Sequence, residues 1–196
     1  MCVIVGGGRV ATRRAKSLLE CGALVRIVAP EISYELSTLT LEVRSKLFES
    51  ADLDGAYLAF AATSDPAVNS EVVEQARLRR ILSSDAETAE RGDFVVPSTL
   101  RRGDLVLAVT TGGASPALAK RIRDEISERY GPEYAIFCAM LKEIRDTVLE
   151  TNADAARRRA VLQLAASDET ALELIREGRQ SDARDRLLNC ISTLQG

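Results

Sequence analysis

The chain opens on the stretch Val3-Ile4-Val5-Gly6-Gly7-Gly8-Arg9-Val10-Ala11, a short apolar run that leads through three glycines into an amphipathic segment. This pattern predicts a strand over residues 2–5 and a helix over residues 9–21. In that setting Gly6-x-Gly8-x-x-Ala11 matches the fingerprint of a dinucleotide-binding βαβ unit. Gly6 permits the tight turn, Gly8 lets a pyrophosphate approach the backbone, and Ala11 allows close packing of helix on strand. The alternative is a glycine turn that serves packing only.

The segments that follow alternate between strand and helix patterns. Apolar runs predict strands over residues 25–29, 41–48, 56–62 and 81–84, and a helix over residues 67–80 follows the turn at Ser64-Asp65-Pro66. Such alternation is typical of a parallel, doubly wound sheet, which we place over about residues 1–100.

The pattern changes near residue 100. Extended runs over residues 94–97 and 105–110 are separated by a turn, and a glycine loop then leads into a helix over residues 117–129. From residue 133 onward only three or four amphipathic helices are predicted. We therefore expect three parts: an α/β domain over residues 1–100, a connecting region over residues 101–132 and a helical domain over residues 133–196.

The composition excludes several classes of protein. The 196 residues carry a net charge of −3, so no bulk basic surface favours nucleic acid. No apolar run is long enough to cross a bilayer, and no secretory signal is recognisable. Four scattered cysteines without a C-x-x-C pair favour reduced thiols and a cytoplasmic location. The chain has no histidine, so acid–base chemistry falls to other side chains, above all to carboxylates.

Two positions at the predicted carboxyl ends of strands are candidate site residues. Asp85 ends the strand over residues 81–84, where the ligand crevice of an open parallel sheet lies, so it either faces a cofactor cleft or caps the next turn. Glu31 follows Ala29-Pro30 near the end of the second strand. It is the nearest candidate for a ribose hydroxyl, and no arginine follows directly to hold a 2′-phosphate, which favours NAD over NADP.

A second glycine loop precedes the helix over residues 117–129. In Thr111-Gly112-Gly113-Ala114-Ser115-Pro116, Ser115 is the predicted N-cap and Pro116 the first helical residue. A capped helix start after glycines is a second anion site, flanked in sequence by several arginines and lysines. Two anion sites suggest a cofactor and a separate anionic substrate, although a solvated helix face is the commoner explanation of the basic residues.

Together these segments resemble the precorrin-2 dehydrogenase family, the NAD-dependent module of sirohaem synthases. The resemblance runs from residue 3 to about residue 127, and it rests on six motifs that occur in order: Val5-Gly6-Gly7-Gly8-Arg9-Val10-Ala11, Val28-Ala29-Pro30, Ala61-Ala62-Thr63-Ser64-Asp65-Pro66-Ala67-Val68-Asn69, Asp85, Asp93-Phe94-Val95-Val96-Pro97-Ser98 and Thr110-Thr111-Gly112-Gly113-Ala114-Ser115-Pro116-Ala117-Leu118-Ala119.

The resemblance implies a Rossmann domain, a small dimerisation region and an α-helical C-terminal domain, assembled as a homodimer. It implies NAD-dependent oxidation of precorrin-2, an anionic tetrapyrrole, to sirohydrochlorin, with no metal held by the chain. Asp85 matches the catalytic aspartate. The implied NAD contacts are Gly6, Gly8, Arg9, Val10, Ala29, Pro30 and Thr63, and the implied substrate contacts are Thr111, Gly112, Gly113 and Ser115.

Three features depart from the family pattern. About ten residues usually precede the first strand, so either the N-terminus is truncated or that segment is dispensable. The strand before Asp85 reads Leu82-Ser83-Ser84, and the loop from Asp85 to Phe94 is two residues longer than usual. Two other functions stay open, namely a bifunctional enzyme that also inserts Fe²⁺ into sirohydrochlorin and a regulatory module that senses NAD without turnover.

Overall fold

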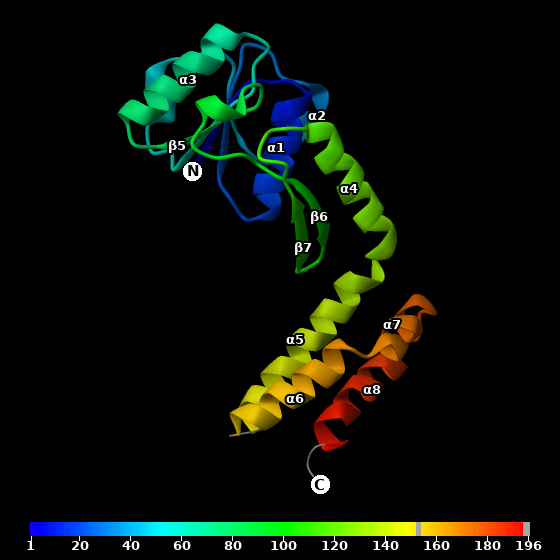
Figure 1. Cartoon of the computed structure of the whole chain (residues 1–196). Helices are drawn as coiled ribbons and strands as arrows, with labels where there is room; N and C mark the ends of the chain where they lie inside the picture. Colours follow the sequence, from blue (N-terminus) through cyan, green and yellow to red (C-terminus); the bar gives the residue numbers. More distant parts are fainter. Residues whose placement is uncertain (152–153, 194–196) are drawn as a thin grey trace. The chain divides into compact units, whose positions relative to one another are not determined.

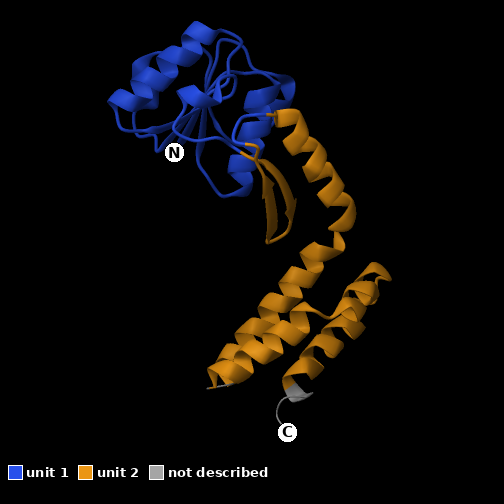
Figure 2. Ribbon diagram, viewed as in Figure 1, with its two compact units in different colours: residues 1–96, 112–114 blue, residues 97–111, 115–196 orange. Residues whose placement is uncertain are grey.

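The computed structural model describes residues 1–151 and 154–193 and divides the chain into two compact units (Figure 2). Unit 1 comprises Met1–Val96 and Gly112–Ala114, and unit 2 comprises Pro97–Thr111 and the residues from Ser115 on. Within the described residues, no helix combines the length and apolar character that a membrane crossing needs.

Unit 1 is a five-stranded parallel sheet with helices on both faces (Figure 1). The strand order is β3-β2-β1-β4-β5, so the central strand is the one that precedes the glycines. The strands are β1 (Cys2–Val5), β2 (Val25–Val28), β3 (Glu42–Arg44), β4 (Leu58–Ala61) and β5 (Leu82–Asp85). The helices are α1 (Arg9–Glu20), α2 (Tyr34–Ser37) and α3 (Pro66–Leu78), with 3₁₀ turns η1 (Ser50–Leu53) and η2 (Ala89–Arg91).

Alternating side chains of the central strand build two separate cores. Ile4 packs with Ala11 and Ala15 of α1, whereas Val3 and Val5 pack with Val72 of α3. Because both faces are covered, the strands are continuous apolar runs rather than alternating ones. This arrangement confirms the predicted Rossmann-like α/β fold and brings the carboxyl ends of β1, β4 and β5 to one edge of the sheet.

Two predicted strands differ from the structure. The strand expected over residues 41–48 is reduced to Glu42–Arg44, because it lies at the sheet edge and pairs with β2 over only three residues. The run over residues 94–97 is not a strand, since Phe94 and Val96 pack as loop residues on the α1 face of the sheet. Phe94 meets the ring of Phe60 edge to face, with 5.7 Å between the ring centroids.

Unit 2 begins with an antiparallel hairpin of β6 (Ser98–Arg102) and β7 (Leu105–Val109). The two strands are joined at Gly103, whose φ of +58° suits a glycine in a tight turn. The helices that follow are α4 (Pro116–Arg129), α5 (Glu133–Thr151), α6 (Ala155–Ala166), α7 (Glu169–Arg176) and α8 (Gln180–Thr193). Phe137, Met140, Ile144 and Val148 of α5 form the centre of its core.

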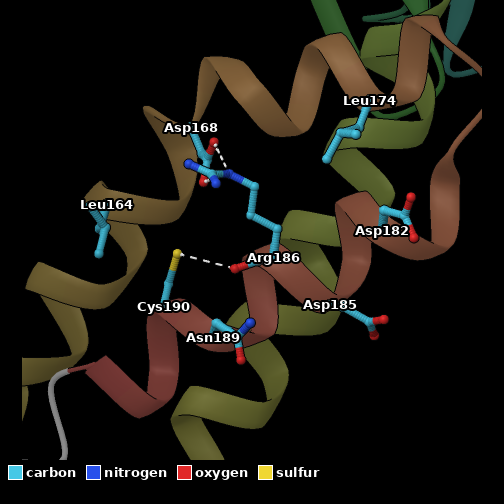
Figure 3. Close-up of a pocket in the computed structure, with 8 residues that line it drawn as sticks. All are labelled: Leu164, Asp168, Leu174, Asp182, Asp185, Arg186, Asn189 and Cys190. Atoms are coloured by element: carbon cyan, nitrogen blue, oxygen red, sulfur yellow. Dashed lines mark hydrogen bonds and ion pairs between the residues drawn. The ribbon is translucent and has the colours of Figure 1, made fainter.

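A cavity of about 570 Å³ lies among the last helices of unit 2 (Figure 3). Its centre holds a pair of structural side chains: Nε of Arg186 donates to both carboxylate oxygens of Asp168 at 2.8 Å. The same carboxylate caps α7, because it accepts the backbone N–H of Ala171 at 3.0 Å. Asp168 therefore fastens the start of α7 to α8.

Asp168→Ala is expected to lower the free energy of unfolding by about 1–2 kcal/mol, chiefly through loss of the α7 cap. The ion pair between Asp168 and Arg186 adds little to the stability, because the Arg186 side chain is half exposed to solvent. Urea unfolding followed by circular dichroism measures the change. Asp182→Ala, which removes an exposed carboxylate from the rim of the same cavity, is the matched control and should cost less than about 1 kcal/mol. Equal losses in the two variants would contradict this role of Asp168.

Candidate cofactor and active site

The three glycines after β1 each have a different environment. Gly6 has a φ of +132°, and a Cβ there would lie 2.3 Å from the carbonyl oxygen of Ala62. A Cβ on Gly7 would overlap the carbonyl oxygen of Glu31. Gly8 has no atom within 4 Å of the same position, so its backbone faces open space. The first two glycines therefore hold the loop against β4 and β2, and the third leaves room for a ligand.

The start of α1 is free to receive an anion. Its N-cap is Gly8, which provides no side chain to cap the helix, and the first turn carries no acidic residue. The first backbone N–H groups of a helix have no intrahelical partner and carry a partial positive charge. Open space at Gly8 and these N–H groups together fit the pyrophosphate of a nicotinamide dinucleotide.

A cavity of about 270 Å³ lies at the carboxyl ends of the strands, and we call it the strand-end cavity. It is formed by the start of α1, the segment after β4 and the segment after β5, with the lining residues Val10, Ala62, Thr63, Ser64, Ala86 and Glu87. Ligands of open parallel sheets bind at this edge. The predicted residues Val10 and Thr63 therefore lie around one cavity.

Thr63 is held in place by a buried side chain of α3. Asn69 is fully buried, and its Oδ1 accepts the backbone N–H of Thr63 at 3.0 Å and the Thr63 hydroxyl at 2.8 Å. Its Nδ2 donates to the carbonyl oxygen of Thr63 at 3.2 Å. Asn69 thereby fixes one wall of the strand-end cavity, a role that the spacing of residues did not reveal.

Asp85 ends β5 as predicted, but its carboxylate is fully buried, with a side-chain exposure of 0%. Oδ1 accepts the backbone N–H groups of Glu87 at 2.8 Å and Thr88 at 3.1 Å, so this oxygen caps the next turn. Oδ2 has no hydrogen-bond partner among the described residues, and Nη1 of Arg91 lies 3.4 Å from it. Asp85 was expected either to face a cofactor cleft or to cap the next turn, and the contacts of Oδ1 are those of a turn cap.

The segment over residues 86–93, which we call the β5 loop, is fastened at both ends. Arg91 donates to the hydroxyls of Thr88 and Ser70, each at 2.7 Å, and so ties the loop to α3. At its far end the Asp93 carboxylate accepts both the N–H and the hydroxyl of Ser83, at 2.8 and 2.9 Å. The loop thus covers the outer edge of β5.

The hydrogen bonds from the amide and hydroxyl of Ser83 lower the pKa of Asp93. A carboxyl whose folded pKa is depressed stabilises the protein above its unfolded pKa of about 3.9, and this contribution is lost as the pH falls through the folded pKa. Asp93→Asn is therefore expected to flatten the loss of stability between about pH 5 and pH 2, by about 0.5 kcal/mol for this exposed group. Urea unfolding at a series of pH values tests this, and parallel curves for the two proteins would contradict it.

The end of β2 carries the predicted contacts Ala29 and Pro30, beside the end of β3. The N–H of Ala29 donates to the carbonyl oxygen of Arg44 at 3.2 Å. Arg44 and Lys46 contact the buried carboxylate of Asp52 at 2.8 and 3.2 Å. Burial disfavours ionisation of Asp52, yet hydrogen bonds from Arg44, the Glu49 amide and Lys46 hold its pKa below the usual value. Arg44 also pairs with Glu42 at 3.0 Å and Lys46 with Glu49 at 3.0 Å, so both cations are already engaged by carboxylates.

The second glycine loop has the local geometry that its sequence predicts. Gly112 and Gly113 have φ of +62° and +91°, and Ser115 caps α4 by accepting the N–H of Leu118 at 3.2 Å. The hydroxyl of Thr111 accepts the N–H of Ser115 at 2.9 Å. Within unit 1, a Cβ on Gly113 would lie 3.3 Å from the Cβ of Ala89. Gly113 therefore lies against the β5 loop.

Reasoning from sequence missed the close approach at Gly7 and four of the residues that line the strand-end cavity, namely Ala62, Ser64, Ala86 and Glu87. Gly7 lies between the two glycines of the fingerprint, and Glu87 lies in a polar loop, where exposed charges are ordinary. The extra length of the segment after Asp85 was the one available signal for Glu87. Among the described residues no group of three His, Cys, Asp or Glu side chains is placed to hold a metal ion.

Known proteins resemble this chain in sequence and in fold. A family described as NAD(P)-binding matches residues 1–98, and the family of the sirohaem biosynthesis protein central region matches residues 102–129. The chain is similar to a precorrin-2 dehydrogenase of Priestia megaterium, with 32% identity over 179 residues that cover 89% of this chain and 88% of that one. The solved structure of SirC, a precorrin-2 dehydrogenase, matches with a TM-score of 0.74 and 31% identity, covering 95% and 92% of the two chains.

Longer relatives match over part of their length. A siroheme synthase of Photobacterium profundum is 31% identical over 192 residues, which are 96% of this chain and 41% of that protein. The chain thus covers 28–41% of the siroheme synthases that it resembles, and 88% and 92% of the two dehydrogenases. On the match to the NAD(P)-binding family and the likeness to dehydrogenases over most of both chains, this chain belongs to the precorrin-2 dehydrogenase family.

Proposed function

We propose that this chain catalyses the NAD-dependent dehydrogenation of precorrin-2 to sirohydrochlorin in sirohaem biosynthesis. The observation that carries the proposal is the strand-end cavity beside the uncapped start of α1, in a chain of this family. In this account Gly8, Arg9 and Val10 hold the pyrophosphate, and Thr63 borders the nicotinamide end. When bound, the nicotinamide supplies the hydride acceptor.

NAD rather than NADP is the proposed cofactor. The choice between NAD and NADP depends on the end of β2, because a cation there would be needed to bind the 2′-phosphate of NADP. Arg44, next to Ala29, is engaged by Asp52, as is Lys46. Calorimetric titration with the two dinucleotides tests this, and tighter binding of NADP⁺ would contradict it.

The proposed substrate site is the second glycine loop. Thr111, Gly112, Gly113 and Ser115 would meet carboxylates of the tetrapyrrole through backbone N–H groups and the capped start of α4. The same helix carries Lys120, Arg121 and Arg123, which suit an anionic substrate. The contact of Gly113 with Ala89 supports a position of this loop beside the β5 loop.

A homodimer is the proposed assembly. The β6–β7 hairpin is a two-stranded sheet among the described residues, and Val106 is 43% exposed on it. The edges of this hairpin and the exposed Val106 side chain could pair with the hairpin of a second copy of the chain. Sedimentation equilibrium is expected to give twice the chain mass. A cytoplasmic location, which accords with four free cysteines, stays a prediction.

The proposed function is tested by adding NAD⁺ to anaerobic precorrin-2 and the protein. Conversion to sirohydrochlorin, with one NADH formed per precorrin-2 consumed, is expected in the absorbance spectrum. A regulatory module that only senses NAD would bind the dinucleotide without this spectral change. Adding Fe²⁺ or Co²⁺ to the product then distinguishes a dehydrogenase from a bifunctional enzyme that also inserts the metal.

A further inference from the structure

We propose that Glu87 is the proton acceptor of the dehydrogenation and that Asp85 is a positioning residue that holds Glu87 at the strand-end cavity. The inference rests on the proposed function and assigns its acid–base step. Oxidation removes two hydrogens from the substrate, one of which leaves as a hydride and carries the bonding electron pair to NAD⁺, the oxidant of the proposed function. The other leaves as a proton to the Glu87 carboxylate, which afterwards releases it to water.

Access favours Glu87 over Asp85. A general base must come within about 2.6–3.2 Å of the proton that it takes, directly or through one water. The Asp85 side chain is fully buried, one oxygen is occupied by two amide N–H groups, and Arg91 lies 3.4 Å from the other. Glu87 is exposed, and it is the one ionisable side chain among the six residues that line the cavity.

The contacts of Asp85 explain how Glu87 is placed. The Glu87 N–H donates to Asp85 Oδ1 at 2.8 Å, so the backbone of the proposed base is fixed directly by the end of β5. Thr88, the next residue, donates to the same oxygen and also accepts from Arg91. Asp85, Arg91 and Ser70 together fix the start of the β5 loop, and Glu87 extends from this fixed backbone.

The neighbouring loops bring this carboxylate to the expected reaction site. Val10 of α1 and Thr63 of the β4 end line the same cavity as Glu87, and both belong to the proposed cofactor contacts. Ala89 of the β5 loop lies against Gly113 of the proposed substrate loop within unit 1. Glu87 therefore lines the cavity of the proposed cofactor contacts, two residues before the one that lies against the proposed substrate loop. In a chain without histidine, a carboxylate is the available base for this step.

The two roles predict different responses to conservative substitution. Glu87→Gln is expected to lower kcat by about 100-fold and to leave the dissociation constant of NAD⁺ unchanged, because a proton acceptor is lost and a neutral isostere remains. Glu87→Asp should recover part of that activity. Glu90→Gln is the matched control, since it makes the same change at an exposed position of the same loop and should retain wild-type kcat.

Asp85 is tested by comparing two substitutions at one position. Asp85→Ala removes the acceptor of both amides, so hydrogen exchange at Glu87 and Thr88 should accelerate and kcat should fall. Asp85→Asn keeps a carbonyl oxygen there, and it should restore slow exchange together with most of the activity. The pH profile of kcat should keep its acidic limb in Asp85→Asn and lose it in Glu87→Gln.

The contrary results are equally distinct. Wild-type kcat in Glu87→Gln, or a change confined to NAD⁺ affinity, would overturn the role of Glu87. Equal loss of kcat in Asp85→Asn and Asp85→Ala, with slow amide exchange retained in the former, would make Asp85 the proton acceptor instead. Absence of turnover in the unaltered protein would overturn the proposed function, and this inference with it.

Discussion

Gly6→Ala is expected to destabilise unit 1 by about 2–4 kcal/mol and to weaken NAD⁺ binding at least tenfold. The added Cβ would lie 2.3 Å from the Ala62 carbonyl oxygen and 2.6 Å from its carbon, and these backbone atoms cannot rotate away as a flexible side chain would. The strand end, the glycine loop or both must therefore shift. Because the loop starts α1 and Ala62 lines the strand-end cavity, the shift displaces two parts of the cofactor site together.

The matched control is Gly55→Ala in the same unit. Gly55 also has a positive φ, of +76°, but no atom lies within 4 Å of its Cβ position. It should therefore show only the cost of backbone strain, about 1 kcal/mol, and normal NAD⁺ affinity. Thermal unfolding measures the change in stability, and calorimetric titration measures the affinity for NAD⁺. If the two variants behave alike, close approach of β1 to β4 is not what requires glycine at position 6.

Asn69→Ala is expected to cost about 2–4 kcal/mol and to weaken NAD⁺ binding about tenfold. The substitution removes three hydrogen bonds between Asn69 and Thr63. The Thr63 hydroxyl keeps the carbonyl oxygen of Asp65 as an acceptor at 3.0 Å, whereas the Thr63 N–H loses its acceptor. A buried donor that loses its partner costs its full desolvation free energy. Thr63 also lines the strand-end cavity, so the loss extends from stability to binding.

Glu74→Ala serves as the control for Asn69→Ala, because it places alanine at an exposed position of the same helix. Its free energy of unfolding should lie within about 0.5 kcal/mol of wild type, and its NAD⁺ affinity should be unchanged. Hydrogen exchange at the Thr63 amide provides an independent measurement, since only Asn69→Ala should accelerate it. An Asn69→Ala protein with normal exchange at Thr63 and normal affinity would refute the role given to Asn69.

The sequence predicted the sheet because local signals and tertiary packing agree in this part of the chain. The run before Gly6 has to be a buried strand, and Ala11 and Ala15 have to face it, since each is fully buried against the sheet. The extended run that includes Phe94 was misread for a related reason. Its apolar side chains pack on the sheet face, as a strand's would, although its backbone makes no ladder.

The candidate site was less accessible to prediction. Chain order placed Asp85 at the end of β5, yet burial of its carboxylate results from two amides of the β5 loop and from Arg91. The contact between Asn69 and Thr63 joins a helix to the turn before it through one side chain, and no periodicity reveals such a contact. Glu87 is one of many surface carboxylates until the backbone of its loop is known.

The most direct measurement of the cofactor site is a titration of the ¹⁵N-labelled protein with NAD⁺, followed by the backbone amide resonances. The account predicts saturable shifts at Arg9 and Val10, at Thr63 and Ser64, and at Ala86 and Glu87, the segments that meet at the strand-end cavity. The amides of α5–α8 should stay unchanged. The account would be contradicted by saturable shifts confined to those helices, or by the absence of a saturable shift at Arg9 and Val10, which directly follow the three glycines.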